Sequence, residues 1–220
     1  MIDYGQARRT MVDCQIRPAD VTDRSLLAAI LAVPRERFLP ARLAELAYVD
    51  LDLPLAGPPE NPTRRLLKPQ VLSKLLQAAE ITSADRVLDI GCATGYASAI
   101  MARLAKSVVA LEEDSDMLQE ARAALAASGN VEVVQGQLAA GWQKSAPYDV
   151  MLLNGAAEVI PESLLGQIAE GGRFVAVVGY GQSAKAMLYR RTNGALSRWP
   201  IFDAAAPLLP GFGIPPAFVF

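Results

Sequence analysis

The sequence contains no histidine, and only two of its 220 residues are cysteine. Without histidine there is no His-based nucleophilic triad and no His-ligated metal site, so any general base must be Asp, Glu, Lys, Tyr or Cys. Cys14 and Cys92 form no paired spacing, which argues against a zinc site and against a disulfide framework. We therefore expect chemistry that needs no base or is assisted by a carboxylate.

Long apolar runs and an excess of basic charge are also missing. No apolar segment reaches the ~18 residues of a membrane-spanning helix, and no basic-then-apolar leader opens the chain. With 21 basic and 23 acidic residues the net charge is −2, whereas a nucleic-acid binder is normally basic. We expect a soluble cytoplasmic protein with no nucleic-acid or membrane partner. The sequence carries no signal for an oligomeric state.

The chain is long enough for one domain, with or without an elaboration, and 52% of its residues are hydrophobic. From residue 86 onward, short apolar runs alternate with helical patterns. This order predicts an α/β, Rossmann-like fold with a mostly parallel sheet covered on both faces. We expect strands at 87–90, 108–111, 131–134, 150–153 and 174–178, with helices at 97–104, 117–127 and 161–169.

The two ends of the chain have different patterns. Asn193-Gly194 lies between two strand-like runs, which predicts an antiparallel hairpin at the edge of the sheet. The first eighty residues indicate helices separated by prolines, and 53–62 and 207–216, rich in proline, are expected to be irregular surface loops. We thus expect a single domain in which residues 1–80 form a helical cap with an acceptor-side loop and residues 81–220 form the cofactor-binding core.

The most informative segment joins the first strand of the core to its helix. An apolar strand containing Asp89 is followed by the small-residue loop Gly91–Tyr96, and the next strand ends in Glu112. The carboxyl ends of such strands form a nucleoside pocket, with the acid accepting hydrogen bonds from the ribose hydroxyls. A dinucleotide fingerprint requires Gly at the first, third and sixth places. Here Ala93 and Tyr96 hold the last two, so S-adenosylmethionine (SAM), which carries no phosphate, fits better.

Several residues around this loop are candidates for contacts with SAM. Asp89 is either a loop residue that supports the cofactor or a cap on the next helix, and Asp114 is the alternative to Glu112. Cys92 is expected to be inert, because methyl transfer needs no enzyme nucleophile. The predicted cofactor-binding residues are Asp89, Gly91, Cys92, Ala93, Thr94, Gly95, Tyr96, Glu112, Glu113 and Gln137.

The layout resembles the protein-L-isoaspartate O-methyltransferase family, within the class I SAM-dependent methyltransferases, over nearly the whole chain. The Val-Pro-Arg-Glu-x-Phe run and the Gly-Trp that precedes Ala-Pro-Tyr-Asp are more diagnostic than the cofactor loop. The segments that carry the resemblance are 11–16, 33–40, 47–50, 53–55, 89–96, 130–131, 136–149, 160–161, 171–172 and 178–179.

The resemblance implies a reaction, its cofactor and its substrate. Members of the family esterify the carboxylate of an isoaspartyl residue in damaged protein, with SAM as methyl donor and S-adenosyl-L-homocysteine as product. This reaction suits a chain without histidine, because a carboxylate with a reference pKa near ~4 is already the nucleophile at neutral pH. Alignment of the two reactants alone is worth roughly 7–11 kcal/mol.

One departure from the family concerns the acceptor. Where the family has an active-site Ser, this chain has Leu67, and Arg64, Arg65 and Lys68 form a small cationic run beside it. This cationic run is either a solvated loop or a group that recognises an anionic acceptor. Asn154, just past the fourth core strand, is a further candidate for contact with acceptor or cofactor. Two alternatives to isoaspartyl methylation therefore remain: methylation of a small anionic acceptor, and a SAM-binding sensor or partner subunit without catalysis.

Overall fold

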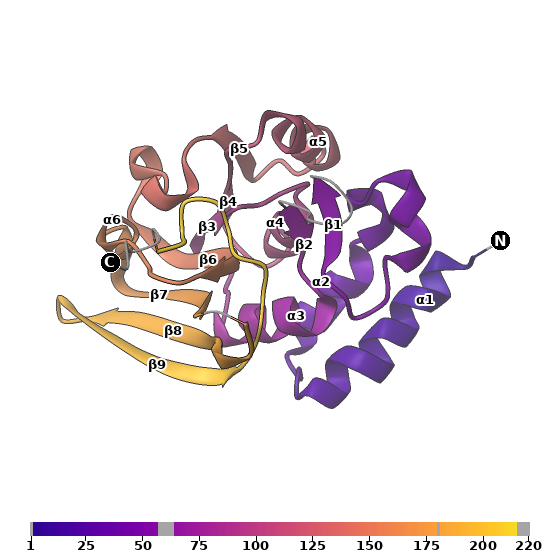
Figure 1. The fold of residues 1–220 in the computed structure, drawn as a ribbon, viewed down its shortest axis with the longest axis horizontal. Helices are drawn as coiled ribbons and strands as arrows, with labels where there is room; N and C mark the ends of the chain where they lie inside the picture. The colour runs from indigo at the N-terminus through magenta and orange to yellow at the C-terminus, as the bar shows by residue number, and fades with distance from the viewer. Residues whose placement is uncertain (1, 57–63, 180, 215–220) are drawn as a thin grey trace, which may run out of the picture.

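A computed structural model describes residues 2–56, 64–179 and 181–214, and its centre is a twisted seven-stranded sheet (Figure 1). The strand order is β5-β4-β3-β6-β7-β8-β9. The strands are β3 (Arg86–Ile90), β4 (Ser107–Glu112), β5 (Val131–Gln135), β6 (Tyr148–Ala157), β7 (Ile168–Val178), β8 (Lys185–Thr192) and β9 (Ala195–Asp203). Strands β3 to β7 pair in parallel and β8 and β9 are antiparallel. The predicted Rossmann-like sheet and its edge hairpin are confirmed.

The chain reverses its direction of progress across the sheet between β3 and β6. After β3 it adds β4 and β5 on one side, and then returns to place β6 against the other side of β3. In α/β sheets of this kind a ligand binds outside the carboxyl ends of the strands that flank such a switch point. The loop after β3 and the end of β6 are therefore where a site is expected.

The helices begin where their sequences allow it. They are α1 (Tyr4–Met11), α2 (Arg24–Ala32), α3 (Pro69–Ala78), α4 (Tyr96–Met101), α5 (Ser115–Leu125) and α6 (Glu162–Leu165). Asp23 accepts a hydrogen bond from the Leu26 amide at the start of α2, and Asp114 caps α5, because such side chains satisfy the free amides at a helix start. Pro69 is the first residue of α3, where its missing N–H costs nothing.

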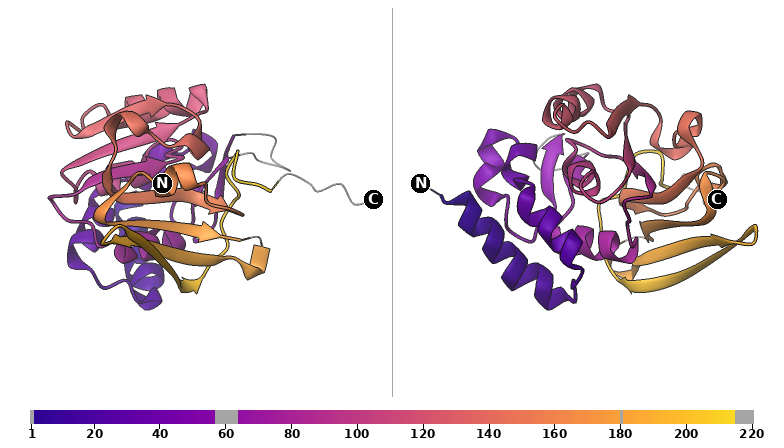
Figure 2. Two further views of the ribbon diagram at one scale, coloured as in Figure 1. Left: turned by 90° about the vertical axis from the view of Figure 1, so that its left-hand side faces the viewer. Right: turned by 180° about the vertical axis from the view of Figure 1, so that it is seen from behind.

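Successive residues of the strands face two separate layers of the core. Val87 of β3, Val108 of β4 and Val150 of β6 pack into a cluster with α2, α3 and the N-terminal segments. Their neighbours Leu88 and Met151 face the opposite layer, with α6 and the C-terminal segment. This alternation buries both faces of the sheet, as a parallel sheet requires. The N-terminal helices lie along one face, and hairpin β8–β9 forms the far edge (Figures 1 and 2).

A small second sheet lies outside this frame. Strand β1 (Leu53–Ala56) pairs antiparallel with β2 (Arg64–Leu66). The prediction of an irregular loop over 53–62 is therefore wrong for 53–56, and the rest of that range, from residue 57, lies outside the described residues. In β2 the side chains of Arg64 and Leu66 are buried and that of Arg65 is half-buried, which is the alternation of a strand.

Two other expectations need correction. Helix α6 is a single turn rather than the predicted 161–169, because β7 already begins at Ile168. The tail is not a free surface loop over its described part: the Leu209 amide donates to the Ala156 carbonyl at 3.0 Å and both Leu209 and Phe212 are buried. Within the described residues, no helix is long and apolar enough to cross a membrane.

Candidate active site

The loop after β3 has a backbone that only small residues tolerate well. Gly91 and Gly95 have φ of +79° and +96°, a region in which side chains are strained. A Cβ on Gly95 would lie 2.8 Å from Leu125 of α5. The amides of Gly91 and Cys92 both donate to the Leu111 carbonyl, at 2.9 and 3.0 Å. The loop is thereby fixed to the end of β4.

Glu112, at the end of β4, is a fully buried carboxylate surrounded by backbone amides. One of its oxygens, Oε2, accepts from the Ala93 amide at 2.8 Å. The other, Oε1, accepts from the amides of Glu113 and Asp114 at 3.0 and 3.1 Å. Hydrogen bonds of this kind satisfy a buried charge without a salt bridge. The carboxylate is thus held in one orientation, with each oxygen able to accept from one more donor.

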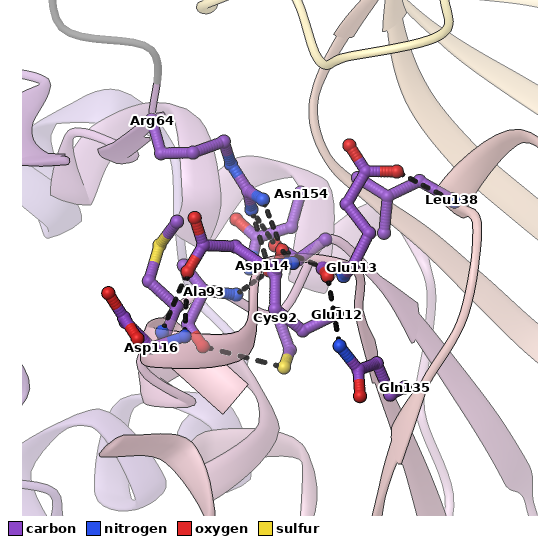
Figure 3. A network of polar contacts seen from close by, with 12 residues as sticks. Arg64, Cys92, Ala93, Glu112, Glu113, Asp114, Asp116, Gln135, Leu138 and Asn154 are labelled. Atoms are coloured by element: carbon purple, nitrogen blue, oxygen red, sulfur yellow. Dashed lines mark hydrogen bonds and ion pairs between the residues drawn. The ribbon is translucent and has the colours of Figure 1, made fainter. Parts of the chain in front are cut away.

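Arg64 of β2 supplies those additional donors. Its Nη1 donates to Glu112 Oε1, its Nη2 donates to Oε2 at 2.8 Å, and Nη2 also reaches the Gly91 carbonyl at 3.1 Å. Figure 3 shows the guanidinium extending from β2 onto the loop and the Glu112 carboxylate. Arg64 and Glu112 have 3% and 0% of their side chains exposed. The ion pair therefore closes the space directly above the acid.

Leu209 covers the neighbouring part of the same edge. A Cβ on Gly91 would lie 3.1 Å from its side chain, and a Cβ on Gly155, in β6, would lie 2.5 Å from it. Its backbone is fixed to β6 through Ala156, whose amide donates to the Pro207 carbonyl at 2.7 Å. The Leu209 side chain consequently fills the switch point between β3 and β6.

Asp89 lies beneath the loop as a fully buried carboxyl group. It accepts from the Ser98 hydroxyl at 2.6 Å and from the Asn154 amide at 3.3 Å. Burial raises the pKa of Asp89 to about 7, although both hydrogen bonds lower it, since desolvation disfavours the charged form. Asp89 and Asn154 thus join β3 to β6. Asn154 lies within β6 rather than just past a strand, where we expected it, because β6 continues to Ala157.

Thr94 and Tyr96 point away from the acid and toward the N-terminal segments. The Thr94 hydroxyl donates to the Phe38 carbonyl at 2.7 Å, and the Tyr96 ring packs edge-on against Phe38 at 5.5 Å between centroids. The Arg35 guanidinium lies 4.8 Å from the same ring. These two side chains hold the loop against the cap. Any contact that they make with a ligand would be through the backbone.

The remaining predicted cofactor residues occupy varied surroundings. Gln137 is exposed, and the Glu113 carboxylate accepts from the Leu138 amide at 3.4 Å. Gln137 lies on the loop after β5, and Glu113 follows β4 directly, so this hydrogen bond joins the two neighbouring loops. Cys92 is buried, and burial raises the pKa of its thiol well above the usual value, so the thiol stays protonated and unreactive.

The predicted acceptor residues lie on the short strand and the turn that follows it. The Leu67 side chain is 1% exposed and packs in the core, while its carbonyl accepts from the buried Arg35 at 2.7 Å. Arg65 donates to the Asp52 carbonyl at 3.0 Å, and the Lys68 amide donates to the Asp52 carboxylate at 2.8 Å. Both side chains are half-buried.

Three features define a class I methyltransferase: a glycine loop with positive φ angles after the first core strand, an acid held by amides at the end of the next strand, and a switch point beside them. Enzymes of this class take their methyl group from SAM. The residues fit its nucleoside part in the groups that they offer: the two oxygens of Glu112 can each accept from one ribose hydroxyl when Arg64 is displaced, and Gly91 places no Cβ beside them. In the conformation described here, Arg64 and Leu209 occupy that space.

Comparison with known proteins makes the assignment more specific. The sequence model of protein-L-isoaspartate(D-aspartate) O-methyltransferase matches residues 6–200, and the chain belongs to this family. Protein-L-isoaspartate O-methyltransferase 1 of Rhodopseudomonas palustris is 38% identical over 187 residues, which cover 84% of this chain and 74% of the relative. The Methanoculleus marisnigri enzyme is 35% identical over 209 residues, 94% of this chain and 93% of the relative.

Solved structures agree on the fold. A protein-L-isoaspartate O-methyltransferase covers 94% of this chain with a TM-score of 0.78 at 24% identity, and 66% of that chain is matched. A Plasmodium falciparum protein in complex with S-adenosyl-L-homocysteine gives the same TM-score at 15% identity, with 95% of this chain and 99% of that chain covered. At such identities the likeness concerns the fold alone.

Sequence reasoning missed two residues of this site, Arg64 and Leu209. Arg64 was part of the recognised cationic run, but the contact with Glu112 depends on β2 being a strand that turns Arg64 inward and Arg65 outward. The sequence Arg-Arg-Leu over 64–66 shows no alternation of polar and apolar residues, so no sequence signal marks Arg64 as an inward-facing residue. For Leu209 no signal exists either, because a single leucine among prolines resembles a surface loop.

Proposed function

We propose that this chain methylates isoaspartyl carboxylates in damaged protein or peptide, with SAM as donor and S-adenosyl-L-homocysteine as product. The observation that carries the proposal is the Glu112 carboxylate, held by three backbone amides beside the Gly91 turn, in a chain that belongs to this family over residues 6–200. We place the reaction in the cytoplasm.

The reaction asks little acid–base chemistry of the protein. SAM supplies an activated methyl group on a sulfonium, which is a good leaving group. The acceptor carboxylate is ionised at neutral pH, so the chain's own residues need only orient it and exclude water. Glu112 would hold the ribose, and Asp89 with Asn154 would support the loop beside the donor. No residue has to remove a proton.

We propose that cofactor binding and acceptor binding belong to different parts of the chain. Residues 81–220 would hold the cofactor, and residues 1–80 would provide the acceptor side of the same domain. Arg65 and Lys68 are the residues that we propose to recognise the acceptor carboxylate. They are half-buried cations near Leu67. By the resemblance described above, Leu67 stands where the family has an active-site Ser, and its side chain offers no hydrogen-bond donor.

The direct test uses labelled SAM and two peptides that differ only in an isoaspartyl or an aspartyl linkage. The proposal expects label in the isoaspartyl peptide alone, released by mild alkali because methyl esters hydrolyse readily. Equal labelling of both peptides, or label that resists alkali, contradicts it. A Glu112→Gln variant is the matched control, since it should lose the cofactor and the label together.

A second candidate rests on the apolar side chain of Leu67. The buried Leu67 side chain offers no hydrogen bond to an acceptor, whereas the half-buried Arg65 and Lys68 beside it are cations, which favours a small anionic acceptor. The same labelled SAM, incubated with a cell extract that is then separated by size, distinguishes the two. Label in the small-molecule fraction, with the isoaspartyl peptide left unlabelled, supports the second candidate. Binding of SAM with no label transferred supports a non-catalytic sensor.

A further inference from the structure

Arg64 makes the contacts on Glu112 that a ribose would make. Its two Nη groups donate separately to the two carboxylate oxygens, as the vicinal hydroxyls of a nucleoside do at the acid of this fold. Among the described residues, every other hydrogen bond to these oxygens comes from a backbone amide of the loop or of the turn after β4. A ribose and the guanidinium therefore compete for the same two acceptors.

Leu209 adds a second obstruction at the adjoining switch point. Its side chain contacts the Cα positions of Gly91 and Gly155 so closely that an added Cβ on either would lie at 3.1 or 2.5 Å. The two glycines belong to the ends of β3 and β6, between which a ligand of this fold lies. Arg64 and Leu209 come from segments far apart in the sequence and converge on Gly91.

One hydrogen-bond donor of the Arg64 side chain also lacks a partner among the described residues. The donor is Nε, which is buried, and a buried donor without a partner is unfavourable. Glu112, by contrast, keeps three amide hydrogen bonds if Arg64 leaves. Departure of the guanidinium therefore relieves an unsatisfied donor on one side and leaves a still hydrogen-bonded carboxylate on the other.

We propose that Arg64 and Leu209 hold this methyltransferase in a self-occupied closed state, in which the guanidinium substitutes for the ribose hydroxyls on Glu112 and the cofactor binds only by displacing it. The proposal rests on the function given above. Its consequence is a cofactor affinity set by competition within the chain: the fraction of molecules with Arg64 withdrawn limits the apparent Kd.

The test is calorimetric titration of the full chain with S-adenosyl-L-homocysteine, which needs no acceptor. Arg64→Met keeps the apolar stem and removes the guanidinium, Arg64→Lys keeps a charge but only one contact, and Leu209→Ala opens the switch point. We expect Arg64→Met to bind at least tenfold tighter than the wild type. Arg64→Lys and Leu209→Ala should bind tighter by smaller factors. Lys74→Ala, which removes a cation that lies over the Phe202 ring, should leave the affinity unchanged.

A second titration identifies the group with which Arg64 competes. Adenosine carries both ribose hydroxyls, and 2′,3′-dideoxyadenosine carries neither. Removal of the guanidinium should strengthen the binding of adenosine markedly and that of the dideoxy compound little. Thermal unfolding of each variant reports whether it is folded, and Arg64→Lys together with Leu209→Ala tests the proposal should Arg64→Met not fold.

The outcomes separate the two proposals. If the wild type binds S-adenosyl-L-homocysteine and the folded Arg64 and Leu209 variants bind it no more tightly, the closed state is overturned. The proposed function is then left intact. No binding by the wild type or by any folded variant overturns the proposed function, and the closed state with it. Binding by Arg64→Met alone supports both.

Discussion

Asp89 is a carboxyl group that retains its proton close to neutral pH. Its pKa is raised to about 7 by burial, with the nearby Glu112 charge adding to the effect. An unfolded aspartate titrates near ~3.9, so between these values the folded chain binds more protons than the unfolded chain. Stability from this group is therefore greatest below pH ~4 and falls as pH rises toward 7.

Substitution of Asp89 by Asn should remove that pH dependence. Asn keeps the shape and can still exchange hydrogen bonds with Ser98 and Asn154, but it has no charge to bury. Because one pKa unit corresponds to about 1.4 kcal/mol, D89N should gain stability relative to the wild type between pH 4 and pH 8, by up to a few kcal/mol. Urea unfolding at several pH values measures it, with the exposed Asp116→Asn as control. Parallel profiles for D89N and the wild type would rule this out.

The proposal that Arg65 and Lys68 recognise the acceptor carboxylate predicts how their substitution changes methylation. Substituting both by Ala should reduce acceptor methylation by at least tenfold while the Kd for S-adenosyl-L-homocysteine stays the same, because the Arg65 side chain donates to the Asp52 carbonyl and, among the described residues, no hydrogen bond or ion pair joins either side chain to the loop at Gly91. Labelled transfer and calorimetry measure the two quantities. Since the neighbouring Lys74 lies over the Phe202 ring instead, Lys74→Ala is the control cation. Unchanged turnover in the double variant rejects the role.

At the level of elements, the sequence specifies where helix α5 begins, because Asp114 caps its first turn. Asp114 accepts from the amides of Asp116 and Met117, both at 3.0 Å, and loss of such a cap costs about 1 kcal/mol. Asp114→Ala should therefore lower the free energy of unfolding by about that amount in urea. Asp116→Ala removes a carboxylate from the same turn without removing the cap, and should cost clearly less. Equal losses would show that charge near the helix start, rather than the cap, is what matters.

The core strands were predictable because their apolar runs are bounded by turn residues, and the Asn193-Gly194 hairpin follows from its turn chemistry. The elements that were missed are short. Strand β2 has only three residues, too few for a period to be visible, and its burial is imposed by the approach of Glu112 from a distant part of the chain. Helix α6 was predicted too long because Ile168 continues an apolar helical pattern although it belongs to β7.

At the level of the whole molecule, the N-terminal cap and the core share one hydrophobic cluster and are joined through Arg35. This fully buried side chain donates to the Ala47 carbonyl at 2.8 Å and to the Leu67 carbonyl at 2.7 Å, and lies against the Tyr96 ring. A single arginine thus connects three segments of the cap with the cofactor loop. The alternating pattern predicted a mostly parallel sheet, whereas this junction depends on contacts that no local pattern records.

Replacement of Arg35 by Lys should destabilise the entire chain. Lysine can satisfy one of the two carbonyls but not both, and a buried polar group left unpaired costs about 1–3 kcal/mol. Because the cluster is continuous, the loss should appear as one cooperative transition shifted to lower urea, measured by circular dichroism. The exposed Arg37→Lys is the control. Two separate transitions would contradict the continuity of cap and core.

The attachment of the loop to β4 restricts where this molecule can change shape. Gly91 and Cys92 donate to Leu111, and Ala93 donates to Glu112, so the turn and the acid form one rigid unit with the sheet. Rearrangement on ligand entry is then limited to the side chains of Arg64 and Leu209, which must rotate away from Gly91. The peptide protons of the loop should consequently exchange with heavy water just as slowly in the free protein as in the occupied one.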